Sequence, residues 1–392
     1  MLRSLKPAQS LLTIIDIATK HQHIIAELDS KDTYKPLQQS LQEVKDGIKV
    51  LEFCALQKHI FNKMTTENGY IYRAPLGNCL FILPFNYPFL LFCWKVGPAL
   101  SAGNSCIVKP SPYTPSSASY IANMLKEPDI LQVVQTSEQE TINLIKSDTV
   151  DHVGFIGGQE GAKAIWNASY GKSMSIESSG CSVLIVHKSA KCEQVASIVT
   201  DAVLENAGQN CCKPSFVLLP KRKLKYLCDK ISMAMSQYKL IPLINDKQKE
   251  IFDKKIALRS KMYKYLKIPK QNGLSNFVNP RLFVSSKELA IEDYEEIFGP
   301  TCIIIPYDNM SQIDAIMSSN KQRLAMGILS KDLQFASNLI HKYRFGINWI
   351  NSYNTCPPDV CFGGSQLSGT SWSKDLGLES IYGLTRLYSI VK

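Results

Sequence analysis

Three side chains with the chemistry for acyl transfer stand near the ends of short apolar runs in this sequence. They are Asn86 in PFNYP, Glu177 in SIESSG and Cys211 in GQNCC, where Cys212 follows at once. A cysteine can form a covalent acyl intermediate, an Asn amide can donate to the developing oxyanion, and a carboxylate can activate water. Each also has a structural explanation: Asn86 would suit a turn, Glu177 a solvated surface, and Cys211 a buried, inert thiol. Only the combination indicates acyl chemistry.

A glycine pair offers a place for a phosphate. The stretch FIGGQEG puts Gly157 and Gly158 between an apolar run typical of a strand and a segment with helical spacing. Free backbone N–H groups at the start of a helix favour an anion. The stretch lacks the G-x-G-x-x-G pattern of dinucleotide sites, and glycine at a strand-to-helix turn is equally expected on structural grounds. The pair is therefore a candidate phosphate turn and no more.

The segments that must position these residues alternate between strand and helix. Residues 78–88 predict a buried strand that ends in a Pro-bounded turn, residues 89–103 a helix, and residues 192–208 a helix directly before the Gly-Gln pair. Residues 6–63 have helical spacing throughout. Alternation of this kind is typical of parallel sheets, and a second series of strands and helices begins after residues 170–180, where a domain boundary is expected. The sequence therefore predicts an α/β protein with two domains.

The composition excludes several classes of protein. The chain has 392 residues, 45% of them hydrophobic and 20% charged, which suits two cores and not a disordered chain. Its formal net charge of +10 is concentrated in residues 221–225 and 253–267. A basic face of this kind could contact nucleic acid or an anionic surface. Because no nucleic-acid motif accompanies these lysines, a solvated face explains them better, and no nucleic-acid partner is predicted. No apolar run is long enough to span a bilayer.

Cysteine usage predicts the compartment. The twelve cysteines are scattered without a C-x-x-C pair, and no cleavable signal sequence precedes them. Reduced thiols, a cytoplasmic protein and no metal site are therefore expected. The start of the chain is basic and free of acids up to Asp16, which would also suit a mitochondrial presequence. The spacing of Leu11, Ile14 and Ile17 equally fits a packed helix.

Seven stretches occur here in one fixed order: APLGNCLFILPFNYPFLLFCWKVGPALSAGNSCIVKPSPYTP, GFIGGQEG, ESSG, AGQNCC, YEEIFGP, GINWIN and CFGGSQLSG. In that order they resemble the signatures of the NAD(P)-dependent aldehyde dehydrogenases, from about residue 70 to the C-terminus. Residues 8–55 look like the helices before that family's first cofactor strand. Within the family, the sequence looks most like the branch that acts on betaine aldehyde and 4-trimethylaminobutyraldehyde.

The resemblance implies a fold and an assembly. The expected fold is that of the aldehyde dehydrogenases, with a Rossmann-like cofactor domain and a second α/β catalytic domain. The implied boundaries are 1–176 for an N-terminally shortened cofactor domain, 177–369 for the catalytic domain, and 370–392 for a C-terminal return and oligomerisation segment. A short oligomerisation arm is expected near 56–73. Because the family extends sheets across subunits, a homodimer or homotetramer is expected.

The resemblance also implies residue roles. Cys211, three residues after the Gly of the Gly-Gln pair, would be the nucleophile and Cys212 a bystander. Asn86 and the Cys211 backbone N–H would hold the oxyanion, and Glu177 would activate the water that releases the acid. The implied cofactor is NAD, with NADP not excluded. Its matching residues are Lys109 and Glu296 at the ribose, Phe298 beside the nicotinamide, and Gly157 with Gly158 at the pyrophosphate.

The implied substrate is a small-molecule aldehyde, with an amino or trimethylammonium aldehyde suggested by the branch. That branch surrounds the cation with aromatic rings, whose π faces attract it. Tyr87, Trp94 and Phe362 match such aromatic positions, and Glu205 would add a charge partner. Packing of a helix explains Tyr87 and Trp94 equally well.

Several departures from the family pattern support a second hypothesis. The family's Glu-Leu-Gly-Gly becomes Glu177-Ser178-Ser179-Gly180, which replaces a glycine that gives the glutamate room to swing. Phe216 stands where an arginine is expected. The Gly-Arg-Glu that usually follows Ser-Gly near the C-terminus is absent, and the chain begins late in the family pattern. The alternative is therefore a catalytically impaired homologue with a binding or structural role.

Overall fold

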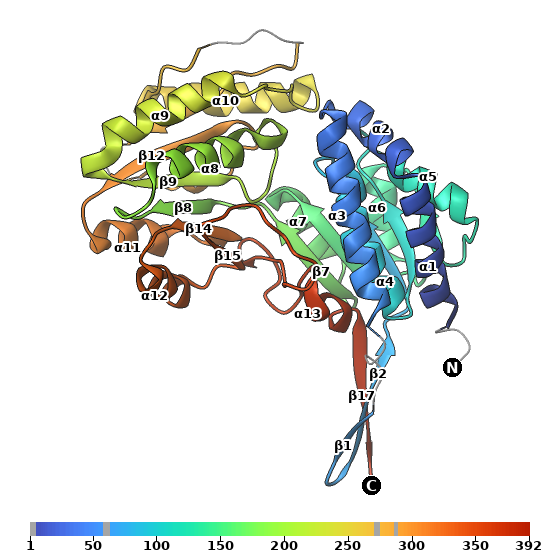
Figure 1. The fold of residues 1–392 in the computed structure, drawn as a ribbon. Helices are drawn as coiled ribbons and strands as arrows, with labels where there is room; N and C mark the ends of the chain where they lie inside the picture. The colour runs from blue at the N-terminus through green and yellow to red at the C-terminus, as the bar shows by residue number, and fades with distance from the viewer. Residues whose placement is uncertain (1–4, 58–62, 270–274, 286–288) are drawn as a thin grey trace. The chain divides into compact units, whose positions relative to one another are not determined.

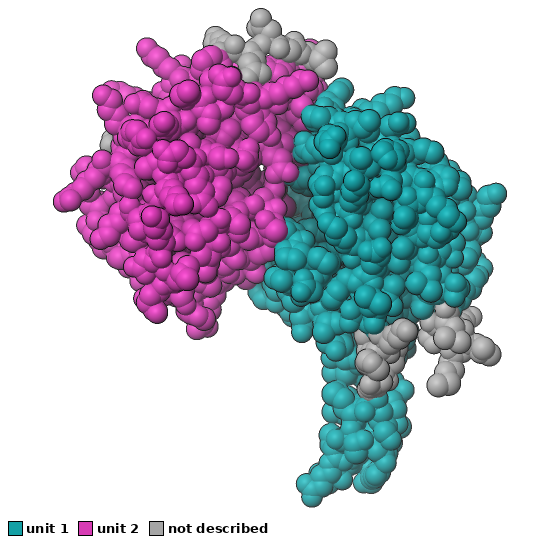
Figure 2. Space-filling view, viewed as in Figure 1, with its two compact units in different colours: residues 1–178, 356–363, 370–392 teal, residues 179–355, 364–369 magenta. Residues whose placement is uncertain are grey.

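The structure is a computed structural model that describes residues 5–57, 63–269, 275–285 and 289–392 (Figure 1). It divides into two compact units, which are coloured separately in Figure 2. Unit 1 comprises Met1–Ser178, Cys356–Gly363 and Thr370–Lys392, and unit 2 comprises Ser179–Thr355 and Gly364–Gly369. The chain thus returns to unit 1 twice after residue 355, whereas the sequence-based division kept residues 177–369 in one domain.

Unit 1 is built on a five-stranded, all-parallel sheet in the order β5-β4-β3-β6-β7. Apolar side chains on one face, Leu80, Val153 and Ile176, pack in a core with Ile145 and Ile165 of two covering helices. The strands are β3 (Asn78–Ile82), β4 (Ser105–Lys109), β5 (Leu131–Val133), β6 (His152–Gly157) and β7 (Ser173–Ser178), and the helices between them are α4 (Pro88–Ser101), α5 (Ser116–Leu125), α6 (Glu138–Lys146) and α7 (Gln159–Ala168).

Three helices precede this sheet, α1 (Leu5–Lys20), α2 (Gln22–Thr33) and α3 (Leu37–Ala55). Helix α3 packs closely along α4. The approach depends on Gly47 of α3, because a Cβ there would lie 2.9 Å from Cys93 Sγ. The helical spacing predicted for residues 6–63 is thus confirmed as far as Ala55, and residues 58–62 lie outside the described residues.

A small antiparallel sheet joins distant parts of unit 1. It has the order β1-β2-β17 and comprises β1 (Met64–Thr66), β2 (Gly69–Pro75) and β17 (Thr385–Val391). Strand β17 follows helix α13 (Gly377–Tyr382) and pairs with β2 from Thr385↔Pro75 to Val391↔Gly69. The predicted arm at 56–73 begins directly after α3 and contains β1 and most of β2; residues 58–62 within it are not described.

Unit 2 holds a seven-stranded sheet in the order β10-β11-β12-β9-β8-β14-β15, parallel except for the edge pair β10 and β11. Alternate residues of its strands face two separate cores. The strands are β8 (Ser182–Val186), β9 (Pro214–Pro220), β10 (Lys264–Tyr265), β11 (Arg281–Val284), β12 (Thr301–Tyr307), β14 (Ala325–Leu329) and β15 (Ile347–Ile350), and a separate pair is β13 (Gln322–Arg323) with β16 (Ser365–Gln366). The helices are α8 (Cys192–Leu204), α9 (Leu224–Gln237), α10 (Asp246–Met262), α11 (Met310–Ser319) and α12 (Leu333–Tyr343), with 3-10 helices η2 (Glu205–Gly208), η3 (Lys221–Lys223) and η4 (Ile291–Tyr294). In the part of the chain that is described, no helix is both long enough and apolar enough to cross a bilayer.

Asp29 of α2 is a buried acid at the start of α4. Its Oδ2 accepts a hydrogen bond from the Phe89 N–H at 3.1 Å. Burial raises the pKa of Asp29 to about 7, although nearby donors and Lys35 act in the opposite direction. Folding therefore takes up a proton at this carboxyl group. The stabilisation is complete below the ordinary Asp pKa and is lost as the pH rises through about 7.

The substitution Asp29→Asn is expected to remove this pH dependence, because the amide oxygen can still accept from Phe89 but does not titrate. Between about pH 5 and pH 8 the free energy of unfolding of the wild type should fall by roughly 2–3 kcal/mol relative to the variant. Urea unfolding at both pH values measures the difference. Glu27→Gln, exposed on the same helix, is the control and should follow the wild type. Parallel pH profiles for Asp29→Asn and the wild type would contradict this prediction.

Candidate active site

Cys211 lies at the end of an irregular turn that other residues hold rigidly. Asn206 and Ala207 of η2 have left-handed backbones, with φ of 51° and 53°. Gly208 follows with φ of +68°, and a Cβ there would lie 2.4 Å from backbone atoms of Gly299, so only glycine fits. The helix predicted for residues 192–208 is therefore wrong at its end, since α8 stops at Leu204.

Hydrogen bonds lock the Gly-Gln pair and separate the two thiols. Gln209 Oε1 accepts from the Ile244 N–H at 2.9 Å, and Asn206 Nδ2 donates to the Gln209 carbonyl at 3.1 Å. Cys212 is only 2% exposed, and its carbonyl accepts from the Tyr353 hydroxyl at 2.7 Å. Cys211 is partly exposed. Accessibility therefore favours Cys211 as the reactive thiol of the pair.

Asn86 lies in the turn between β3 and α4, and a buried lysine anchors its backbone. The side chain of Lys35 is fully buried, and its Nζ donates to the Asn86 carbonyl and to Glu43 Oε2, both at 2.6 Å. The same ammonium lies 4.0 Å from the centroid of the Tyr87 ring. Lys35, 51 residues earlier in the chain, thus binds the Asn86 backbone and lies against the ring of the next residue. Sequence reasoning missed Lys35, because nothing in its local pattern marks a buried cation.

Glu177 lies near the end of β7, buried against a glycine. An ideal Cβ on Gly363, whose φ is +144°, would be 2.5 Å from Glu177 Oε1. Lys374 Nζ donates to the Gly363 carbonyl at 2.9 Å. Gly363 therefore provides the space that the Glu177 carboxylate occupies. Ser179, the residue that departs from the family pattern, belongs to unit 2, where its hydroxyl donates to Gln322 Oε1 at 3.2 Å.

Two of the predicted aromatic residues are in contact within unit 1. The rings of Trp94 and Phe362 meet edge to face, with centroids 4.9 Å apart. The Phe362 backbone pairs with Asp375, and Lys95, the residue after Trp94, binds Asp375 Oδ1 at 2.5 Å. This buried ion pair holds the two aromatic residues together. One face of the Tyr87 ring is occupied by Lys35, so Tyr87 already contacts a cation of the protein itself.

Four of the predicted residues gather at one edge of the unit 1 sheet. Lys109 ends β4, Gly157 ends β6, and Glu177 pairs with Ile156 beside it. Asn86 follows β3, which lies between β4 and β6. The chain moves from β3 to β4 and β5 on one side, and then to β6 and β7 on the other. The carboxyl ends of strands at such a change of direction form the crevice in which open α/β sheets bind their ligands.

The unit 1 residues fit a dinucleotide at this edge. Gly158 caps α7 without a side-chain hydrogen bond, and a Cβ there would meet nothing within 4 Å, so the N–H groups of the first turn are open to an anion. Lys109 is half-buried, and burial lowers its pKa, opposed by Glu138. Lys109, Gly157 and Gly158 are the residues of this unit that would hold the cofactor.

The unit 2 candidates are Glu296, Phe298 and Glu205. Burial raises the pKa of Glu296 to about 7, opposed by Lys213. Its ionised form could accept from ribose hydroxyls. Phe298 follows two residues later, and its carbonyl accepts from Gln248 at 3.3 Å. Glu205 Oε2 accepts from Asn354 Nδ2 at 2.6 Å, so its carboxylate already has a partner in the protein.

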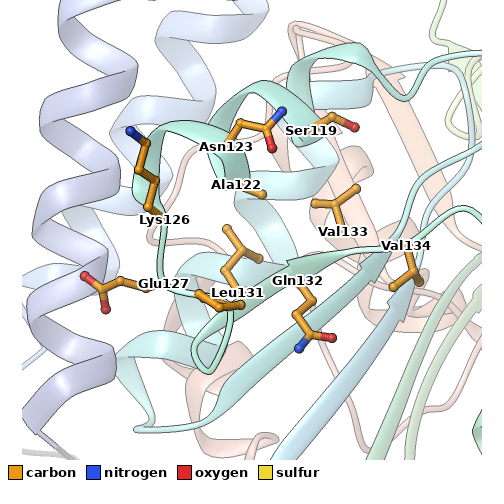
Figure 3. Close-up of a pocket in the computed structure, with 10 residues that line it drawn as sticks. Ser119, Ala122, Asn123, Lys126, Glu127, Leu131, Gln132, Val133 and Val134 are labelled. Atoms are coloured by element: carbon orange, nitrogen blue, oxygen red, sulfur yellow. The ribbon is translucent and has the colours of Figure 1, made fainter.

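The predicted residues thus form two groups, each described within its own unit. Unit 1 contains Asn86, Glu177, Lys109, Gly157, Gly158, Tyr87, Trp94 and Phe362, and unit 2 contains Cys211, Glu205, Glu296 and Phe298. Figure 3 shows a separate cavity of about 550 Å³ in unit 1, between α5 and β5. None of the predicted site residues lines this cavity.

Comparison with known proteins identifies the family of this chain. Residues 5–390 match the model of the aldehyde dehydrogenase family. The chain belongs to the aldehyde dehydrogenase family. The resemblance found in the sequence and the α/β fold expected from it are thereby confirmed, and the family is one of oxidoreductases.

Individual members of the family are distant in sequence. The chain is 26% identical to a betaine aldehyde dehydrogenase of Cereibacter sphaeroides, over 99% of this chain and 85% of that protein. It is 27% identical to the NADP/NAD-dependent aldehyde dehydrogenase PuuC of Escherichia coli, over 96% of this chain and 81% of that protein. A crystal structure of apo betaine aldehyde dehydrogenase from Staphylococcus aureus superposes with a TM-score of 0.92 at 21% identity, over 99% of this chain and 83% of that one. The NAD+ complex of an aldehyde dehydrogenase from Bacillus cereus superposes with a TM-score of 0.90 at 23% identity, over 99% of this chain and 84% of that one. These likenesses to solved structures establish the fold.

Proposed function

We propose that this aldehyde dehydrogenase homologue oxidises an aldehyde to the carboxylic acid with NAD+ or NADP+, through a thioester on Cys211. The observation that carries the proposal is the gathering of Asn86, Lys109, Gly157 and Glu177 at one sheet edge where the strand order reverses. The partly exposed Cys211, set apart from the buried Cys212, supports it. Names of the relatives above, which include NAD-dependent enzymes, support the cofactor.

Each side chain then has a defined task. The Cys211 thiolate adds to the aldehyde carbon, and the Asn86 amide and the Cys211 N–H donate to the oxygen that becomes negative. Bound NAD(P)+ supplies the acceptor for the hydride that leaves this carbon. Glu177 takes a proton from water, which attacks the thioester carbon and releases the acid and the free thiol.

The proposal is tested by following NADH absorbance with 4-trimethylaminobutyraldehyde, betaine aldehyde and a plain aliphatic aldehyde. Turnover of any of them is expected, together with a rise in the thermal midpoint on adding NAD+, because a ligand of the native state stabilises it. A folded protein that shows neither NADH nor a thermal shift would overturn the proposal. That outcome would favour the impaired homologue suggested by Ser178 and Ser179.

We further propose a trimethylammonium or amino aldehyde as the substrate. Support comes from the Trp94 and Phe362 rings, which are held in contact by the Lys95–Asp375 ion pair. Ring faces attract a cation by about 0.5–2 kcal/mol. Two relatives are betaine aldehyde dehydrogenases by name. Tyr87, which is buried and already contacts Lys35, would contribute its ring, and Glu205 its charge.

Trp94→Leu is expected to discriminate against the cationic substrate. The ratio of kcat/KM for 4-trimethylaminobutyraldehyde to that for its uncharged isostere, 5,5-dimethylhexanal, should fall by roughly 3- to 30-fold, because only the cation loses the π face. Steady-state kinetics of wild type and variant with both aldehydes measure this ratio. Trp166→Leu, which changes an exposed tryptophan of α7, is the control. An equal loss for both aldehydes would show that Trp94 only fills space.

The assembly is also a proposal. Strand β17 lies at one edge of its sheet, and Leu387, Tyr388 and Ile390 on it are each about half exposed. An edge strand with exposed apolar side chains is suited to pairing with a second chain. We therefore propose a homodimer or homotetramer that uses β17, in a cytoplasmic enzyme. Light scattering of the wild type and of Ile390→Lys would test it, with a smaller mass expected for the variant.

A further inference from the structure

The net charge of the chain resides in one stretch of unit 2. Residues 221–267 contain 14 Lys and Arg against 4 Asp and Glu, whereas the rest of the chain contains 30 of each. This stretch forms η3, α9, α10 and β10. The excess positive charge is therefore a property of residues 221–267 and not of the chain as a whole. The proposed oxidation makes no use of it.

Helix α10 orders part of this charge into a stripe. Lys247, Ile251, Lys254, Leu258 and Lys261 are spaced by four, three, four and three residues, so they lie on one face of the helix. All five are exposed, as is Met262 at the end. The opposite side packs into unit 2 through Phe252 and Ile256. An exposed face thus alternates basic and large apolar side chains over about 22 Å.

The lysines of the stripe differ from the other lysines of α10. Lys249 pairs with Asp253 and Lys255 with Glu295. Lys247, Lys254 and Lys261 form no ion pair with an acid among the residues that the structure describes. The five stripe residues include no acid, although the exposed Glu250 lies beside Lys247 and Lys254 on the helix surface. The exposed Lys264 and Tyr265 of β10 follow the stripe in the chain. Its charge is therefore available to an external anion.

Exposed apolar side chains identify the kind of anion. Leu258 is 55% and Ile251 43% exposed, in the middle of the lysines. Phosphate contacts of a nucleic acid would use the lysines and leave these two side chains without a role. A second copy of α10 would bring lysines against lysines. A bilayer surface with anionic headgroups accommodates both, because lysines attract the headgroups and apolar side chains enter the boundary with the acyl chains.

We propose that the α10 stripe docks unit 2 reversibly on a membrane surface rich in anionic phospholipid. The docking is peripheral, in keeping with the absence of a spanning helix from the described residues. The binding is independent of the oxidation chemistry and holds whether or not the proposed activity is found.

Vesicle flotation tests the proposal with the full chain. The wild type is expected to float with vesicles of phosphatidylcholine doped with phosphatidylserine, to remain in solution with phosphatidylcholine alone, and to be released by salt. The triple variant Lys247→Glu, Lys254→Glu, Lys261→Glu should lose affinity by roughly a hundredfold or more. The double variant Ile251→Ser, Leu258→Ser should lose about tenfold while keeping the full charge.

A matched control keeps the change in net charge and moves it elsewhere. Lys31→Glu, Lys45→Glu and Lys146→Glu alter exposed lysines of unit 1 by the same total charge and should leave flotation near the wild-type value. Circular dichroism confirms that all variants are folded. An equal loss of vesicle affinity in both triple variants would contradict the assignment of docking to the α10 stripe. If the wild type does not float with the vesicles, the proposal of membrane docking fails. It also fails if the protein binds polyuridine more tightly than vesicles and the triple lysine variant loses both interactions.

Discussion

Replacing Cys211 with alanine is expected to abolish NADH formation, with a fall in kcat/KM of roughly three orders of magnitude or more, because no other group can carry the thioester. Cys212→Ala should keep most of the activity. The turn presents Cys211 partly exposed, while Cys212 is buried with its carbonyl bonded to Tyr353. Steady-state absorbance assays of the three proteins measure the effect.

A cofactor-free readout makes this comparison independent of NAD+. An activated ester such as p-nitrophenyl acetate needs a thiol and oxyanion donors but no hydride acceptor, so a burst of p-nitrophenol should report acylation of Cys211. Peptide mass spectrometry then locates the acetyl group. Acetylation of Cys212, or loss of the burst in Cys212→Ala alone, would reverse the assignment of the two thiols. A burst of p-nitrophenol without NADH formation from aldehydes would show that the nucleophile works and that the cofactor site does not.

Asn86→Ala is expected to slow the acylation step by about 10²- to 10³-fold, the usual cost of losing one oxyanion donor. Lys35→Met should reproduce a part of this loss, because Lys35 Nζ holds the Asn86 carbonyl at 2.6 Å and a methionine cannot. Lys35→Met should also lower the free energy of unfolding by about 3–5 kcal/mol, since Glu43 is left buried without its partner. Burst rates and urea unfolding measure the two effects.

Glu43→Gln is the matched control for the positioning role of Lys35. It removes the ion pair but leaves Lys35 able to donate to Asn86, so it should cost stability and little acylation rate. If Lys35→Met and Glu43→Gln slow the burst equally, the lysine serves only the stability of unit 1. If Asn86→Ala leaves the burst unchanged, the proposed oxyanion role of Asn86 fails.

The sequence predicts well what short-range patterns determine. The strand predicted within residues 78–88 is β3 (Asn78–Ile82), and the helix predicted for residues 89–103 is α4 (Pro88–Ser101). The family resemblance was specific because seven stretches occur in order, and the family match covers residues 5–390. The residue roles taken from the resemblance remain predictions, supported by the edge that Lys109, Gly157 and Glu177 share.

Features that depend on long-range contacts were beyond sequence reasoning. The Lys35–Asn86 bond joins residues 51 positions apart, and the Lys95–Asp375 pair joins residues 280 apart. The predicted helix continued to residue 208 because Ala207 is a strong helix former, although Asn206 is a weak one. The left-handed backbones of both residues accompany hydrogen bonds that join Asn206 to Gln209 and Gln209 to Ile244. The α10 stripe escaped notice because both sides of that helix carry apolar residues.

The return of the chain to unit 1 has a consequence for synthesis on the ribosome. Unit 2 is nearly all contained in Ser179–Thr355, whereas unit 1 needs Cys356–Gly363 and Thr370–Lys392 as well as its first 178 residues. The second-made unit can therefore close while the first-made one still lacks β17 and the Asp375 partner of Lys95. Until those residues emerge, one hydrogen-bonding edge of β2 and the Lys95 ammonium lack their partners, which makes the nascent N-terminal part a natural client for chaperones.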